Sequence, residues 1–199
     1  MKLFPGLPRH QRIMMAVMFG AVSVYALVQQ KERVGQITSL RLQDPRPRVI
    51  DGDTLDVQGS RVRIVGIDAP DDDRPGLKQL STQTLQGLAA RDGGVECATS
   101  LFDFALRKEN QCRTPVESYG RLNLSCRFKA NGASVAATMV AQGYAVDFRR
   151  YSGGAYVELM QRAAEQRLGL WAQDYEGMRR LATEKATLPQ GCKADTIQK

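Results

Sequence analysis

Two neighbouring segments of the 199-residue sequence combine carboxylates with an arginine. The first is Asp51-Gly52-Asp53-Thr54, and the second runs from Arg63 to Asp68. Oxygen atoms of carboxylates and carbonyls are the ligands that a hard dication such as Ca²⁺ prefers, and a guanidinium pairs well with phosphate oxygens. Asp53 follows a turn and Asp68 ends a β-type stretch, so we expect the two carboxylates to converge if their strands are neighbours.

Arg63 and Asp68 are separated by five positions in the sequence. Side chains alternate between the two faces of a regular strand, so residues five apart point in opposite directions. The two can share a site only if the strand bulges or ends near Gly66, and glycine tolerates the backbone that this requires. We therefore expect the strand to be interrupted at Gly66.

Asp68 also begins a group of four aspartates within Gly66–Asp73. A short acidic run is usually a solvated loop. That interpretation is preferred for Asp72 and Asp73. Asp68 is different, because Asp53 and Arg63 give it a site to belong to.

Turn signals and hydrophobic spacing predict the elements that must position these residues. Asp-Gly and isolated glycines separate short β-branched stretches, whereas apolar residues spaced by three and four indicate helices. Short strands combined with helices predict an α+β fold, a small antiparallel barrel with helical supports. The expected strands lie between Val49 and Ile67, around Val95 and at Leu122–Phe128, and the expected helices lie at 77–88, 134–141 and 155–168.

Residues Ile13–Val28 form a run of sixteen residues without a charge. A membrane span needs about 20 residues and tolerates about 17, so this run is short for an anchor. It also suits the apolar region of a cleaved signal peptide, and a buried core helix is disfavoured because no polar face is present. We prefer a membrane anchor, with a cleaved signal as the alternative. The expected organisation is an anchor or signal at 1–28, a linker at 29–48, a domain at 49–175 and a tail at 176–199.

The net charge of +7 is concentrated near the N-terminus. Eight of the 28 basic and two of the 21 acidic residues lie in 1–48, which leaves 20 basic and 19 acidic residues in 49–199. Bulk charge therefore gives the domain no basic signature for nucleic acid. His10 is the only histidine, so a histidine general base, a histidine-rich zinc site and a Ser-His-Asp triad are excluded from the domain.

The sequence contains four cysteines, and none of them forms a C-x-x-C pair. Four cysteines that all follow an apolar N-terminal segment suit an oxidising compartment, with reduced buried thiols as the alternative. Cys97 and Cys126 both lie at the ends of expected strands. Four cysteines allow three connectivities. Among them we select a Cys97–Cys126 disulfide, which leaves Cys112 and Cys192 to pair, and we favour a domain outside the cytoplasmic membrane.

Three motifs occur in the order of one known family, with VIDGDT at 49–54, RIVGIDAPD at 63–71 and YGR at 119–121. Together with Tyr156 and GLW at 169–171, they resemble the staphylococcal nuclease (thermonuclease) family over about residues 49–171. The resemblance implies an α+β fold, a five-stranded OB-type antiparallel β-barrel with three helices. It also implies Ca²⁺-dependent hydrolysis of DNA and RNA with little sequence preference.

The same resemblance assigns expected roles to residues of this sequence. The residues matched to calcium ligands are Asp53, Asp68 and, through its carbonyl, Ala69. The residues matched to phosphate-binding arginines are Arg63 and Arg121. The residues matched to substrate contacts are Thr54, Tyr119 and Tyr151.

Asp71 departs from the pattern, since the family usually has a glutamate there that positions the attacking water and acts as general base. Aspartate is shorter by one methylene, roughly 1.5 Å, and a misplacement of about 1 Å can cost about 10²-fold in rate. Asp71 would then work slowly, the loop would move inward, or Asp72 or Asp73 would substitute.

Two functional hypotheses follow from these residues. The first is a Ca²⁺-dependent nuclease that acts outside the cytoplasmic membrane, either anchored or secreted. The second is a weakened or inactive module of the same fold that binds nucleic acid or an envelope partner. We expect DNA or RNA and, through the N-terminal segment, a membrane as partners of a monomer. A purely structural envelope protein would leave the arginines and aspartates without a purpose.

Overall fold

The computed structural model describes residues 40–99 and 117–187. The hydrophobic helix expected within residues 1–28, most of the expected linker, Cys112 and Cys192 lie outside these ranges. Among the helices within these ranges, none is long and apolar enough to cross a membrane.

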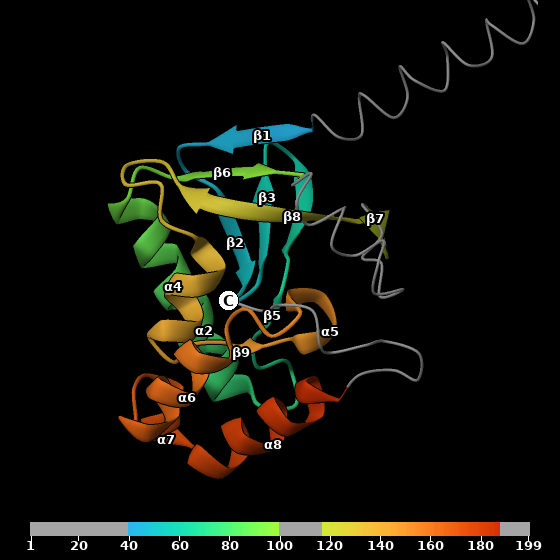
Figure 1. Ribbon diagram of the computed structural model, residues 1–199. Helices are drawn as coiled ribbons and strands as arrows, with labels where there is room; N and C mark the ends of the chain where they lie inside the picture. The colour runs from blue at the N-terminus through green and yellow to red at the C-terminus, as the bar shows by residue number, and fades with distance from the viewer. Residues whose placement is uncertain (1–39, 100–116, 188–199) are drawn as a thin grey trace, which may run out of the picture. The chain divides into compact units, whose positions relative to one another are not determined.

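One curled sheet contains most of the strands (Figure 1). Its strands follow the order β1-β6-β8-β4-β3-β2, with β7 paired to β8 beside this path. A second, two-stranded sheet pairs β5 with β9. The strands are β1 (Arg41–Asp44), β2 (Arg48–Asp51), β3 (Thr54–Val57), β4 (Ser60–Ile64), β5 (Ile67–Asp68), β6 (Val95–Ala98), β7 (Glu117–Ser118), β8 (Arg121–Phe128) and β9 (Val146–Asp147).

In Figure 1, α2 and α4 lie to the left of the larger sheet, and α6, α7 and α8 lie below it. Three of them, α2, α4 and α6, correspond to the expected helices, and α5 and α7 are single turns. This α+β arrangement of a curled sheet and helices confirms the expected fold class. The helices are α2 (Pro75–Arg91), α4 (Val135–Ala141), α5 (Arg149–Ser152), α6 (Val157–Glu165), α7 (Leu170–Gln173) and α8 (Tyr175–Ala186).

One strand pair differs from the all-antiparallel expectation. β4 and β8 are parallel, with Val62 opposite Leu122 and Ile64 opposite Leu124, whereas the other pairs of this sheet are antiparallel. A parallel pair requires a long crossover connection, and the chain between β4 and β8 supplies it with β5, α2 and β6. Local turn signals do not reveal such a pairing.

Alternation along the strands separates the core from the site. Val62 and Ile64 are almost completely buried, and so are Leu124 and Phe128 on β8. Since side chains alternate between faces, Arg63 between the two buried β4 residues points away from this core. The strand thus provides both the apolar packing and one of the candidate site residues.

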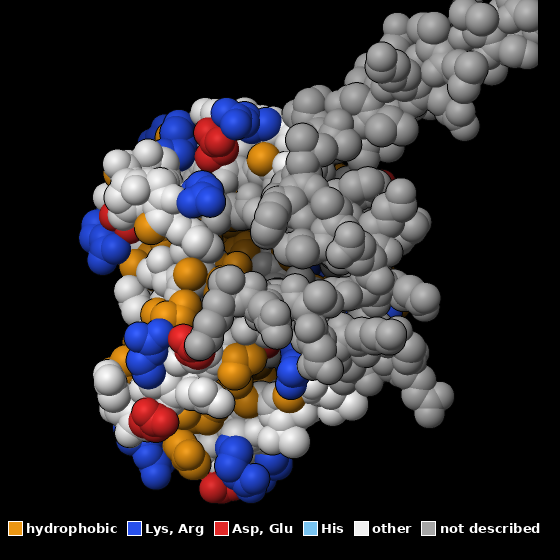
Figure 2. Space-filling model, in the orientation of Figure 1, with side chains coloured by type: hydrophobic (Ala, Val, Ile, Leu, Met, Phe, Trp, Pro, Cys, Tyr) orange, Lys and Arg blue, Asp and Glu red, His pale blue; other side chains and the backbone are white. Residues whose placement is uncertain are grey.

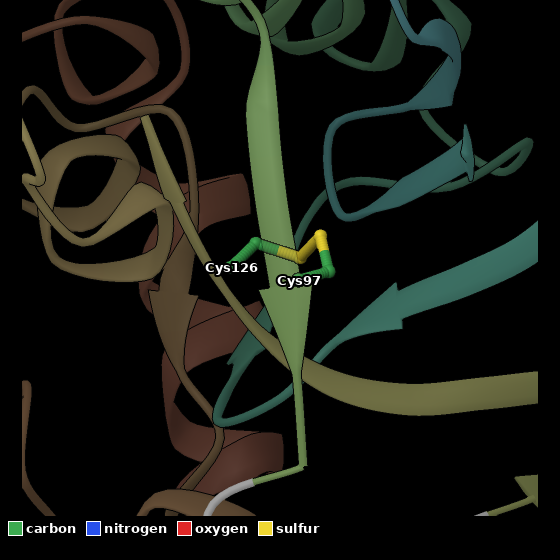
Figure 3. Close-up of a disulfide and its surroundings, with 2 residues drawn as sticks. All are labelled: Cys97 and Cys126. Atoms are coloured by element: carbon green, nitrogen blue, oxygen red, sulfur yellow. A yellow bond between two sulfur atoms is a disulfide. The ribbon is translucent and has the colours of Figure 1, made fainter. Parts of the chain in front are cut away.

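A disulfide joins β6 to β8. Cys97 and Cys126 are directly opposite each other in the antiparallel register, with Cα atoms 4.0 Å apart, and both are buried (Figure 3). The expected Cys97–Cys126 bridge is therefore confirmed. The expected Cys112–Cys192 bridge lies outside the described residues.

Ordered structure extends past both expected limits of the domain. β1 lies within the segment interpreted as a linker. It belongs to the domain, because it pairs with β6 and its Leu42 packs against the core. α8 lies almost entirely within the expected tail. It also belongs to the domain, because its Met178 and Leu181 are buried. These two elements were not predicted from the sequence, because a four-residue edge strand and a helix among charged residues show only weak hydrophobic periodicity. The division into 1–28, 29–48, 49–175 and 176–199 as a whole stays a prediction.

Candidate active site

The strand is interrupted at Gly66, as expected, and this interruption brings Arg63 and Asp68 together. β4 ends at Ile64, and β5 starts at Ile67. Gly66 between them has a φ of +88°, a conformation that side-chain-bearing residues rarely adopt. The turn cancels the alternation that would have placed the two side chains on opposite faces.

The guanidinium of Arg63 joins the two candidate metal carboxylates. Its Nη1 pairs with Asp53 Oδ1, and its Nη2 pairs with Asp68 Oδ1. Nη2 also donates to the carbonyl oxygen of Ile67 at 3.1 Å. The guanidinium of Arg63 on β4 therefore contacts one carboxylate from β5 and one from the β2–β3 turn.

Asp53 is 2% exposed and is held from several sides. The backbone N–H of Ala69 donates to its Oδ2 at 2.8 Å, and the hydroxyl of Thr54 donates to its Oδ1 at 2.9 Å. Burial raises the pKa of Asp53 to about 8, even though Arg63 lowers it, and the neighbouring Asp51 and Asp68 raise it further. A buried carboxyl group among like charges is a place where an additional cation would be stabilised.

The tight turn before Asp53 depends on Gly52. A Cβ atom at this position would lie 1.9 Å from the Oγ of Ser81 on α2 and 2.7 Å from the Cβ of Ala69. No other residue fits without moving the helix or the turn. This close approach holds Asp53 against the backbone of Ala69.

A cavity of about 620 Å³ opens beside these carboxylates. Asp53, Thr54 and Ala69 do not line it and are buried behind its wall. Thr54, expected at the substrate, instead contacts Asp53. The expected site residues that line the cavity are Arg63, Asp68, Asp71, Tyr119, Arg121 and Tyr151.

Arg121 begins β8, after a hairpin turn made by Tyr119 and Gly120, both with positive φ. The parallel pairing places Asn123 opposite Arg63, so Arg121, two residues earlier, lies on the same face as Arg63. The Nε of Arg121 is buried and has no hydrogen-bond partner within the described part of the chain. A buried unpaired guanidinium N–H is costly, and an anion in the cavity would satisfy it.

Asp71 lines the cavity, yet its side chain is 81% exposed. Slight burial raises its pKa, but the hydrogen bond from Lys78 and the N–H of Asp72 outweigh this, so the pKa of Asp71 is lowered. Lys78 Nζ lies 3.3 Å from Asp71 and 2.7 Å from Asp72. The ammonium on α2 therefore contacts two exposed acids, Asp71 and Asp72, and lies nearer to Asp72. Asp72 and Asp73 are exposed, as expected of a solvated loop.

Several residues at this site were not foreseen from the sequence, among them one aromatic and two basic side chains. Phe148 and Arg150 line the cavity, and both contact Tyr151: the rings of Phe148 and Tyr151 meet edge to face at 4.6 Å, and Arg150 lies 5.3 Å from the Tyr151 ring centre. Lys185 Nζ lies 3.4 Å from Asp68 Oδ2. The aromatic and basic run at 148–151 was a usable signal, whereas Lys185 is far from Asp68 in the sequence.

The oxygen set around Asp53 and Asp68 fits a hard dication by ligand type. It offers two carboxylates, and residues 40–99 and 117–187 contain no histidine and no cysteine outside the Cys97–Cys126 disulfide. No group of three or more histidine, cysteine or acidic side chains arranged to hold a metal occurs in residues 40–99 and 117–187. A cation held here would therefore need further oxygens from water or phosphate, and Arg63 would have to leave at least one carboxylate.

Comparisons with known proteins identify the family of the chain. Residues 61–173, more than half of the chain, match the family model described as staphylococcal nuclease homologue. Asp53 and Thr54 precede the matched residues, and α8 follows them. The chain is also 31% identical over 125 residues to a succinoglycan biosynthesis protein, ExoI, of Rhizobium meliloti (strain 1021). That alignment covers 62% of this chain and 61% of the relative.

Proposed function

Because the chain belongs to the staphylococcal nuclease family, we propose that its cavity binds the phosphodiester backbone of DNA or RNA and hydrolyses it with little sequence preference. Family membership supports a nuclease-type or nucleic-acid-binding module. Hydrolysis itself, the dependence on Ca²⁺ and the place of action are parts of the proposal.

The observation that carries the proposal is the meeting of two arginines at one cavity beside Asp68. Arg63 and Arg121 come from different strands, and the buried Nε of Arg121 lacks a partner within the described ranges. Guanidinium groups stabilise the charge that develops on phosphate oxygens during phosphoryl transfer.

We assign Asp53, Asp68 and the carbonyl of Ala69 as the residues that would hold Ca²⁺. The bound ion would neutralise phosphate charge as a Lewis acid. Arg63 and Arg121 would hold the non-bridging oxygens, and Asp71 would orient a water and accept its proton. The water oxygen bonds to phosphorus, the ester P–O bond breaks, and the leaving oxygen is protonated from solvent. Tyr119 and Tyr151 would contact the neighbouring nucleotides.

A second candidate function is a weakened or inactive module that binds nucleic acid or an envelope partner. The exposure of Asp71 and its contact with Lys78 favour this alternative, since a general base must reach the water that it activates. The relative named for succinoglycan biosynthesis also leaves catalysis open for this chain.

The place of action that we propose is outside the cytoplasmic membrane. The buried Cys97–Cys126 disulfide supports this location, because disulfides persist in oxidising compartments. The segment at 1–28 would anchor the chain, or direct its secretion if it is cleaved, and we propose that the chain acts as a monomer.

The proposal is tested by incubating the purified full-length chain with single-stranded DNA in millimolar Ca²⁺ and in excess chelator. We expect fragments only with Ca²⁺, and little cleavage by Asp53→Ala. Intact DNA after incubation with Ca²⁺ would refute the nuclease hypothesis. Binding without turnover, unchanged in Asp53→Ala, would support the binding module.

The reach of Asp71 is tested by Asp71→Glu, which adds one methylene. A large gain in rate, up to about 10²-fold, would show that the native enzyme is limited at this position. Lys78→Met tests the contact between Lys78 and Asp71, because it removes the ammonium group without lengthening the acid. Absence of cleavage by the native chain and both variants would point to binding alone.

A further inference from the structure

Helix α8 lies beyond the matched residues 61–173 and carries a lysine to the proposed metal site. Its buried residues Met178, Leu181 and Ala182 recur at spacings of three and four. Lys185 continues the same row, seven positions after Met178, so it lies on the helix face that packs inward. The sequence of the helix therefore directs this ammonium toward the protein and not toward solvent.

The ammonium of Lys185 ends beside Asp68. Its Nζ lies 3.4 Å from Asp68 Oδ2, while Arg63 pairs with Asp68 Oδ1. Both side chains are largely shielded, with 20% of Lys185 and 14% of Asp68 exposed. Arg63 and Lys185 thus each contact one of the two carboxylate oxygens of Asp68.

Two further groups hold Lys185 in place. Its Nζ pairs with Glu184 at 2.8 Å and lies 5.3 Å from the ring centre of Phe148, a residue of the cavity wall. Glu184 is 65% exposed, so Asp68 is the more shielded of the two acids. Ion pairs that are shielded from water are screened less by salt than exposed ones.

We propose that Lys185 is a tethered counter-cation of Asp68 that competes with a divalent cation and thereby sets the affinity of the site. This inference rests on the proposed role of Asp53 and Asp68 in holding the metal. An ammonium and a dication at one carboxylate repel each other, so Lys185 must withdraw from Asp68 Oδ2 before the site is fully available. Arg63 gains a phosphate as its new partner, whereas Lys185 retains Glu184 and the ring of Phe148.

A plain structural ion pair is the competing explanation for this contact. In that case Lys185 would only fasten α8 to β5, and its removal would lower stability without changing cation affinity. The measurement must therefore be cation binding in the absence of nucleic acid.

The test is calorimetric titration of CaCl₂ into the full-length chain and its variants. We expect Lys185→Met to lower the Kd for Ca²⁺ by about 3- to 10-fold, as removal of a nearby like charge predicts, and Lys185→Arg to retain the native Kd. Arg179→Met is the matched control. It removes a positive charge from the same helix, where Arg179 pairs with the exposed Glu176.

Thermal unfolding verifies that each variant folds. If Lys185→Met does not fold, Lys185→Gln replaces it, because glutamine keeps a donor toward Asp68 without the charge. A Kd for Lys185→Met that equals or exceeds that of Arg179→Met would overturn this inference alone. Absence of Ca²⁺ binding by the native chain and every variant would overturn the proposed metal site and this inference with it.

Discussion

At the residue scale, Arg63 is the side chain on which the candidate site depends. It pairs with Asp53 and Asp68 at once, and Asp53 is 2% exposed. Removing Arg63 would leave a buried carboxylate without its counter-charge, which typically costs about 3–5 kcal/mol. A loss of activity in Arg63→Ala would therefore mix folding with catalysis, and Arg121 is the cleaner probe.

We predict that Arg121→Ala lowers the rate of DNA cleavage by about 10²- to 10³-fold, the usual cost of one transition-state donor. Arg121 begins β8, and its Nε makes no hydrogen bond within the described part of the chain, so its loss breaks no pairing of that nitrogen. Steady-state kinetics on single-stranded DNA would measure the effect. Arg127→Ala on the same strand is the control, since Arg127 is exposed and donates to the carbonyl of Gly132. Equal rates in both variants would contradict a role for Arg121.

At the element scale, β8 connects the core to the site. It pairs with β4 on one side and with β6 on the other, and the disulfide fixes the second pairing. Arg121 lies at its start and Cys126 near its end. The stability of this strand therefore bears directly on the position of Arg121.

We predict that the double variant Cys97→Ala/Cys126→Ala is less stable by about 3–4 kcal/mol, the chain-entropy value for a loop closed by residues 29 apart. Urea unfolding of the variant and of the oxidised native chain would measure the difference. Reductant should shift the native midpoint by more than that of the variant, because the variant keeps only the expected Cys112–Cys192 bridge. Identical midpoints for the native chain with and without reductant would refute this contribution.

The short strand β9 contains a buried acid with consequences for pH. Asp147 is 2% exposed, and its Oδ1 accepts a hydrogen bond from the N–H of Tyr156 at 3.2 Å. Burial raises the pKa of Asp147 above its ordinary value of 3.8, although Ser152, Tyr156 and Arg149 oppose the shift. Its contribution to stability is thus fully present below pH 3.8 and is lost as the pH rises through the raised pKa.

We predict that Asp147→Asn raises Tm at neutral pH by about 2–4 °C, the shift that 1 kcal/mol produces in a chain of this size. Asparagine retains the acceptor for Tyr156 and removes the buried charge. The gain should disappear at acidic pH, where the native carboxyl is protonated. Thermal unfolding over a pH series would measure it, and a gain that is constant with pH would argue against the raised pKa.

At the scale of the whole molecule, charge is distributed unevenly. Residues 49–199 hold 20 basic and 19 acidic residues, and most of the net charge of +7 lies in 1–48. On the face shown in Figure 2, Lys and Arg side chains are spread over the described surface and do not gather in one patch. Arginines of the cavity, and not bulk charge, should therefore dominate binding of a nucleic acid to the domain.

We predict a shallow salt dependence for binding of single-stranded DNA in the presence of chelator. Contacts from Arg63, Arg121 and Arg150 to two or three phosphates imply a slope of log K against log salt of about −1.4 to −2.1. Fluorescence anisotropy over a salt series would measure it, and Arg121→Ala should reduce the slope by about 0.7. A much steeper slope would assign binding to the basic residues of 1–48.

The sequence by itself determined the fold class, the family and the list of residue types available for chemistry. The motifs around Asp53, Arg63 and Arg121 are local, and the break at Gly66 follows from the period-two alternation of a strand. The Cys97–Cys126 bridge was also predictable, because both residues lie in short strands. The motifs and the interruption at Gly66 were predictable because they depend on neighbours in the chain, whereas the bridge joins residues 29 positions apart and was selected among three connectivities.

The tertiary structure alone decided which of these residues share a surface. The parallel pairing of β4 and β8 places Arg121 on the face of Arg63, and the packing of α8 brings Lys185 to Asp68. Asp71 is largely exposed and contacts Lys78 on α2. These contacts join elements that are distant along the chain, or they depend on the position at which a helix packs. Local periodicity carries no information about long-range pairing or helix position.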